Sequence, residues 1–194
     1  MWSPAGSFQV ETFRVEDIKP RIDWKNKRWA LAKKQPTKGR ELVFVYSQKD
    51  LAGIKVEVHY EIYDGIPLIS KWFTVQNDGN KDIKLNTFVS EVLAMIEPES
   101  SVERGTTGWE LPNIHIESDY EFHSMSMKNA NKVVHWEKDE KYSSQANYRR
   151  LTPCLMECKL PIGPNENIQS GAEFESFRVW ELPYDSYDRQ RKGL

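Results

Sequence analysis

The strict alternation of apolar and polar residues from Ile54 to Ile62 constrains the fold of this chain more than any other stretch. A period of two is typical of a β-strand with one buried face, here the face of Ile54, Val56, Val58, Tyr60 and Ile62. Asp64-Gly65 follows, a dipeptide that accepts positive φ, and a second apolar run over 66–75 begins at once. The stretch therefore predicts a β-hairpin of two long strands.

The pattern of strands and turns continues on both sides of this hairpin. A turn at 77–80 and an apolar segment at 88–96, which Pro98 closes, extend it into an antiparallel meander. Further strands are expected at 8–13, 42–46, 83–85, 114–118, 133–137, 151–160 and 174–180. Because such strands need a second layer over their apolar face, the expected fold class is an all-β antiparallel β-sandwich.

The length and composition favour one such domain. A chain of 194 residues with 39% hydrophobic and 29% charged residues buries a sizeable core, and a net charge of −2 provides no general attraction to nucleic acid or to acidic membranes. No apolar run approaches the roughly 20 residues of a membrane helix. Trp24 and Trp29 lie in a basic segment, which the irregular pattern favours as a loop clamped on the sandwich rather than a nucleic-acid contact. We therefore expect neither a nucleic-acid nor a membrane partner.

The residues that most often carry metal or redox chemistry lie in unpromising spacings. Cys154 and Cys158 fall on one face of a predicted strand, about 13 Å apart, which is too far for a mutual disulfide. They are expected to be buried free thiols. His59, His115, His123 and His135 are scattered, outside any metal-ligand spacing. No metal, no cofactor and no catalytic residue is predicted.

The loop from Gly105 to Asn113 holds the candidate carbohydrate-contacting residues. Its two glycines, two threonines and Pro112 leave the backbone free to project from the sandwich. Trp109 offers an aromatic face for a sugar ring, and Glu110 offers an acceptor for sugar hydroxyls. The alternative is that Trp109 folds back onto Leu111 and caps the core.

Two blocks of the sequence resemble a known family. The run Tyr60-Glu-Ile-Tyr-Asp-Gly-Ile-Pro-Leu-Ile-Ser-Lys-Trp-Phe-Thr-Val-Gln-Asn-Asp-Gly79, continued by Ile83, Leu85 and Val89-Ser90-Glu91, resembles the N-terminal β-supersandwich of melibiase-type α-galactosidases. The run from Phe174 to Ser186 resembles the end of such a domain in large bacterial polysaccharide-degrading proteins. This superfold is also that of galactose mutarotases.

The resemblance implies a non-catalytic β-sandwich domain over 1–184 and the start of a linker helix over 185–194. A catalytic barrel of the same parent chain is then the expected partner, and the catalytic carboxylates of the family lie on that barrel. A carbohydrate is the expected ligand of the parent, and a sandwich loop such as that of Trp109 reaches the sugar site in related enzymes. A periplasmic or secreted location follows from a polysaccharide substrate.

Two other functions stay open at this point. A freestanding mutarotase-like or lyase-like carbohydrate enzyme requires a His or Tyr and a carboxylate that converge on a concave sheet. An independent carbohydrate-binding module requires an aromatic platform or a polar cleft.

Overall fold

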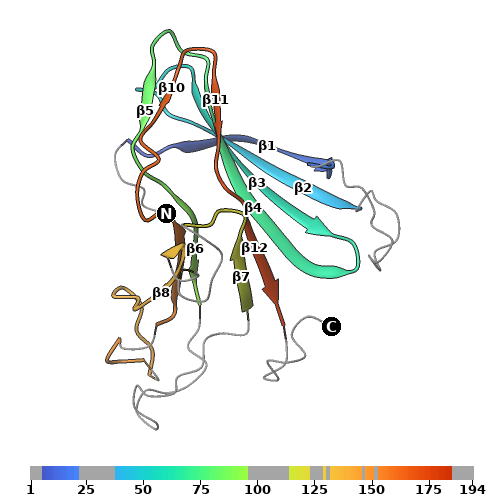
Figure 1. Cartoon of the computed structure of the whole chain (residues 1–194), viewed down its shortest axis with the longest axis vertical. Coiled ribbons are helices and arrows are strands. Elements are labelled where there is room, and N and C mark those ends of the chain that lie inside the picture. Colours follow the sequence, from blue (N-terminus) through green and yellow to red (C-terminus); the bar gives the residue numbers. More distant parts are fainter. Residues whose placement is uncertain are drawn as a thin grey trace.

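The computed structural model describes residues 6–21, 38–95, 114–122, 129, 132–145, 147–150 and 153–184. These residues form twelve β-strands and no α-helix, so the all-β fold class is confirmed for the described part of the chain (Figure 1). Within that part, no helix is long and apolar enough to cross a membrane. The expected linker helix at 185–194 lies outside the described residues.

The larger layer is a seven-stranded sheet, which we call the main sheet. Its order is β1-β2-β3-β4-β12-β7, and β11 also pairs with β4. The strands are β1 (Gln9–Asp17), β2 (Gly39–Ser47), β3 (Ile54–Tyr63), β4 (Ile66–Asn77), β7 (Ile114–Ser118), β11 (Glu173–Glu175) and β12 (Val179–Pro183). All the pairings are antiparallel.

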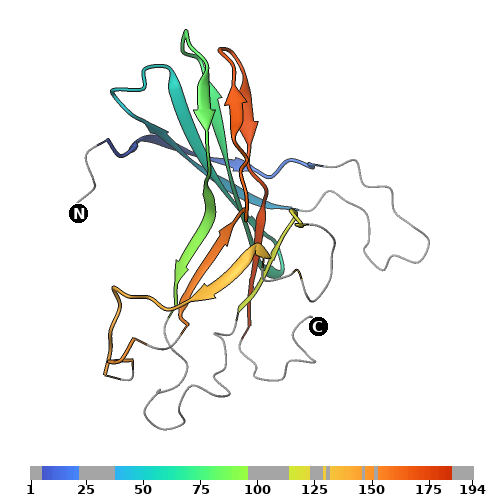
Figure 2. The same cartoon turned by 60° about the vertical axis from the view of Figure 1, so that its left-hand side comes forward.

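Two smaller sheets supply the rest of the sandwich. One pairs β5 (Ile83–Leu85) with β10 (Glu166–Ile168), and the other has the order β6-β9-β8. The strands of this three-stranded sheet are β6 (Val89–Ala94), β8 (Val134–Glu137) and β9 (Leu155–Lys159). In Figure 2 they lie together in the lower part of the molecule, while β1 and β2 cross its middle.

The hairpin that organises the sequence is present. β3 and β4 pair from Ile54↔Asn77 to Tyr63↔Ile66, and Gly65 in the turn has a φ of +78°. The predicted meander ends at β4, however. Because β5 pairs with β10 and β6 pairs with β9, the chain leaves the main sheet after Asn77, and β12 takes the next place beside β4.

Several strands differ from the expectation. β2 begins at Gly39 rather than at Leu42, and β10 lies at Glu166–Ile168, where no strand is expected from the sequence. β1 extends to Asp17, since it pairs with β2 from Ser47 to Arg40. The segment expected at 174–180 is two strands, because Ser176 breaks the ladder against β4. Its backbone N–H donates to the Phe73 carbonyl, and its Oγ accepts the Phe73 N–H at 2.9 Å. Arg178 follows this break, and its backbone N–H donates to Asp119 Oδ1.

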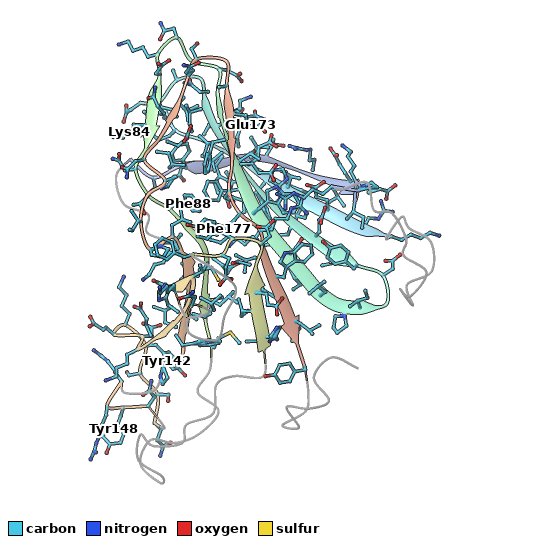
Figure 3. The ribbon with its side chains drawn as sticks, viewed as in Figure 1. Lys84, Phe88, Tyr142, Tyr148, Glu173 and Phe177 are labelled. Atoms are coloured by element: carbon cyan, nitrogen blue, oxygen red, sulfur yellow. The ribbon has the colours of Figure 1, made fainter. Side chains whose placement is uncertain are left out.

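The core has two apolar clusters on one face of the main sheet. Ile54, Val75 and Ile168 form the first under β5 and β10, and Met156, Cys158 and Val179 form the second under the three-stranded sheet. Aromatic rings join the two clusters. Phe88 and Phe177 lie 5.6 Å apart between centroids, in the middle of the molecule (Figure 3). Both cysteines are free and buried, as predicted.

Candidate functional site

Polar side chains of β2, β3 and β4 gather on the face of the main sheet opposite those apolar clusters. We call this the charged face, and its central members are Glu41, His59, Glu61, Trp72 and Arg178. Cross-strand register places Glu41 beside Glu61 and His59 beside Trp72, so the four share one side of the sheet. The sequence pattern predicts that His59 and Glu61 face solvent. That prediction is wrong, since they are only 8% and 4% exposed.

The indole of Trp72 contacts two polar side chains, those of His59 and Arg178. The His59 ring stacks on it at 4.7 Å with an interplanar angle of 8°, and the Arg178 guanidinium carbon lies 3.5 Å from the ring centroid. A guanidinium over an aromatic face is stabilised by the ring quadrupole, most strongly when water is excluded. Trp72 is therefore buried, as its place in the strand predicts, but it lies on the side of the main sheet that faces away from the apolar clusters, and its partners are polar.

Glu61 is the anion that balances Arg178. Arg178 donates from Nη1 to Glu61 Oε2 at 2.9 Å, and the hydroxyls of Tyr63 and Ser70 donate to the same oxygen at 2.6 and 3.2 Å. Burial, followed by this hydrogen bond to Glu61, raises the pKa of Tyr63 above its ordinary value of 10.0. Three donors on one carboxylate oxygen satisfy a charge that would otherwise be costly to bury.

Glu41 and Glu57 flank His59 on this face. His59 Nδ1 lies 2.7 Å from Glu41 Oε1, and His59 Nε2 lies 3.8 Å from Glu57 Oε2. Arg14 of β1 donates hydrogen bonds from both terminal nitrogens to the carboxylate oxygens of Glu57, at 3.0 and 2.6 Å. The hydrogen bond from Arg14 holds the pKa of Glu57 below its usual value. The charged face thus holds two ion pairs, Arg14 with Glu57 and Arg178 with Glu61, and the contact between His59 and Glu41.

A second polar group, the interlayer cluster, lies between the main sheet and the three-stranded sheet. Lys71 of β4 donates to Glu91 Oε1 of β6 at 2.8 Å, and Glu181 of β12 lies beside Glu91. Burial, then the proximity and the charge of Glu91, raise the pKa of Glu181 to about 8. Burial by itself would lower the pKa of Lys71, but the Glu91 contact raises it. Cys158 faces the same cluster, and burial raises the pKa of its thiol to about 12.

Neither group presents an open site to a sugar. A glycosidase pair must flank a glycosidic bond, with a carboxyl separation of about 5–9 Å, whereas Glu91 and Glu181 are only 3% and 7% exposed and lie beside each other. The His59 and Glu41 contact has the residue types of a mutarotase-like acid–base pair, but both side chains are buried at 8% exposure. These groups hold strands and layers together.

The candidate carbohydrate-contacting residues and the histidines considered from the sequence do not come together in one site among the described residues. Trp109 and Glu110 lie outside the described residues, as does His123. His115 is exposed beside Glu117, and His135 contacts the Lys132 carbonyl. Among the described residues, no group of three or more His, Cys, Asp or Glu side chains could hold a metal ion.

Sequence reasoning overlooked Glu41 beside His59, Arg178 beside Glu61, and the pair of Glu91 and Glu181 near Lys71. The available signal was weak. Each is a charged residue inside an apolar strand segment, such as Glu41 before Leu42 or Glu181 after Trp180. A charge at such a position indicates a buried partner, but it does not identify that partner.

On the other side of the main sheet, strands β1 to β3 carry a row of apolar side chains that are exposed or half-buried in the described part of the chain. We define the apolar sheet face as Phe13, Val15, Leu42, Phe44, Tyr60 and Ile62. Phe13, Val15 and Ile62 are 63%, 58% and 55% exposed, and the other three are half-buried. In Figure 1, β1, β2 and β3 extend away from β6 and β8, which lie on the other side of the molecule.

Comparisons with known proteins give a likeness of fold. No protein-family model matches the sequence, and no curated protein does. Among solved structures, the chain is similar to the GH36 alpha-galactosidase AgaA from Geobacillus stearothermophilus, at 13% identity and a TM-score of 0.46. A variant of that enzyme in complex with raffinose aligns at 15% identity and a TM-score of 0.47, and one with 1-deoxygalactonojirimycin at 14% and 0.45. These alignments cover 94–95% of this chain and 29% of the enzyme, so the chain spans less than a third of the length of the protein that it resembles.

Proposed function

We propose that this chain is a non-catalytic β-sandwich module of a larger glycoside hydrolase of the α-galactosidase type, and that it packs on the catalytic barrel of that protein. The observation that carries the proposal is the burial of the polar residues of the β3 and β4 hairpin. His59 and Glu61 are buried in contacts with Glu41, Trp72 and Arg178, so they support the sheet rather than face a substrate.

The resemblance in sequence suggests the family of the parent protein. The block from Tyr60 to Gly79, whose likeness to melibiase-type domains suggests the parent, is the hairpin of β3 and β4 at the centre of the main sheet. In this proposal the parent is a bacterial polysaccharide-degrading enzyme, periplasmic or secreted, and its catalytic carboxylates lie on the barrel. Residues 1–184 form the module, and 185–194 begin the linker helix.

The proposal is tested first with the purified 194-residue chain. We expect no hydrolysis of nitrophenyl α-galactoside and no acceleration of sugar anomer interconversion in a polarimeter. The native reading frame should continue into barrel strands that bear two catalytic Asp or Glu residues, and the longer protein should hydrolyse the galactoside. Mutarotation by the 194-residue chain that is abolished in His59→Asn would instead establish the mutarotase-like enzyme.

A carbohydrate contact is part of the same proposal. Trp109 and Glu110 are proposed to reach the sugar pocket of the barrel, because a Gly-rich loop can project a stacking face and an acceptor. In the longer protein, Trp109→Ala should raise KM and leave Tm unchanged. A lower Tm with an unchanged KM means that Trp109 caps the core. Calorimetric binding of galactosides by the 194-residue chain, with the same affinity in the longer protein, would point to an independent binding module.

A further inference from the structure

Three neighbouring strands carry an aromatic row, which is exposed at Phe13 and half-buried at Phe44 and Tyr60. Cross-strand register places Phe13 opposite Phe44, and the rings lie 6.3 Å apart between centroids. Phe44 in turn meets Tyr60 edge to face, at 6.2 Å and 88°. Rings that are already fixed against one another lose little conformational freedom on binding, and aromatic anchors of this kind dominate protein interfaces.

The surroundings of this row resemble the rim of an interface. Val15 lies opposite Leu42 in the next row, so apolar side chains continue along the strands. Asp17 and Arg40, which form an exposed ion pair at 2.6 Å, end the apolar sheet face, and Ile62 lies opposite Arg40. An apolar centre with a charged border is the usual anatomy of a protein contact surface.

The size of the apolar sheet face distinguishes between occupants. Three strands about 4.8 Å apart, with alternate residues over about 20 Å of strand, cover roughly 300 Å². A stable complex of separate proteins buries about 800 Å² per partner, whereas domains linked in one chain contact each other over about 300–750 Å² per side. Linkage makes the second contact intramolecular and so lowers the area that it needs.

We infer that the apolar sheet face is the docking surface for a domain joined to this module in the same polypeptide. The inference rests on the proposed function and adds the location of the contact, with Phe13, Phe44 and Tyr60 as its centre. Lys71 lies 5.3 Å over the Tyr60 ring, so the docking surface adjoins the interlayer cluster that joins the two layers. A docked domain would therefore lie on the same side of the main sheet as the interlayer cluster.

Thiol labelling tests the inference directly, because the native Cys154 and Cys158 are 1% and 0% exposed and give a low background. Val15→Cys places a thiol on the apolar sheet face. The matched control is Ile162→Cys, at an apolar residue that is 71% exposed outside this face. Both variants are labelled with a maleimide in the 194-residue chain and in the longer native protein.

We expect Val15→Cys to react at least tenfold more slowly in the longer protein than in the 194-residue chain, while Ile162→Cys reacts equally in both. Equal rates for Val15→Cys overturn the inference. Protection of Val15→Cys in the 194-residue chain that increases with protein concentration also overturns it, since a second copy would then be the occupant. The proposed function fails separately, if the native reading frame holds no barrel or the longer protein hydrolyses no glycoside.

Discussion

The two faces of strands β1 to β3 reverse the usual distribution of side chains. On one face Glu41 and Glu61 are 8% and 4% exposed, and on the other Phe13 and Val15 are 63% and 58% exposed. The alternation along β1 shows the same reversal, since Arg14 and Glu16 are half-buried between its exposed apolar residues. Charge in this sheet is therefore no guide to exposure.

Different physical terms stabilise the two faces. On the charged face, each buried charge has a partner in hydrogen-bonding contact, and removal of one partner leaves the other desolvated without compensation. On the apolar sheet face, exposed rings contribute little to the stability of this chain, and they become favourable when another surface removes them from water. The charged face stabilises the folded chain, and we assign the apolar sheet face to contact with another domain.

The largest effect is expected at the centre of the charged face. Arg178→Met keeps much of the apolar length of the side chain but removes the charge that pairs with Glu61 and lies over Trp72. Loss of one partner of a buried ion pair costs about 3–5 kcal/mol. Urea unfolding followed by tryptophan fluorescence measures the change in the free energy of unfolding.

Arg21→Met is the matched control, because Arg21 pairs with Asp119 and Glu175 at 41% side-chain exposure. An exposed pair contributes at most about 1 kcal/mol. The double variant Arg178→Met/Glu61→Gln should recover part of the loss, since it removes the uncompensated charge. Equal losses in Arg178→Met and Arg21→Met would contradict the role of the charged face.

The interlayer cluster sharpens the comparison, because its charges do not balance. Two carboxyl groups, Glu91 and Glu181, face one ammonium, that of Lys71, with the Cys158 thiol alongside and Tyr60 next to Lys71. The pKa of Glu181 is raised from 4.5 to about 8, so the folded protein binds this proton more tightly than the unfolded chain does. The stability from this group is fully present below pH 4.5 and falls as the pH rises to about 8.

Glu181→Gln mimics the protonated carboxyl and should remove this part of the pH dependence. The variant should gain stability relative to the wild-type protein as the pH rises from 5 to 8, by on the order of 3 kcal/mol at the upper end. Urea midpoints measured at several pH values give the two curves. Glu173→Gln, at an exposed glutamate of β11, should run parallel to the wild-type curve, and a parallel curve for Glu181→Gln would refute the assignment.

The smallest effect separates the two faces with one substitution. Val43 of β2 is 1% exposed on the charged face, and Val15 of β1 is 58% exposed on the apolar sheet face. Threonine keeps the β-branched shape, so Val43→Thr differs from Val15→Thr mainly in the burial of its hydroxyl. We expect a loss of about 1–3 kcal/mol for Val43→Thr and less than about 0.5 kcal/mol for Val15→Thr. Similar losses in thermal unfolding would mean that the two faces do not differ in this way.

The sequence by itself determined the local elements of this protein. The alternation from Ile54 to Ile62 and the Asp64-Gly65 turn specify the β3 and β4 hairpin, because a strand repeats every two residues and glycine accepts the φ of the turn. The same reasoning found the free buried state of Cys154 and Cys158. These features depend on residues that are near one another in the chain.

Only the tertiary structure decided which face of that hairpin is buried and by what. A period of two assigns residues to two sides but does not say which side meets a partner. The partner of Glu61 is Arg178, 117 positions away, and the partner of Lys71 is Glu91 in another sheet. A buried charge is stable only where a partner compensates it, and a local pattern cannot identify a partner that is distant in the chain.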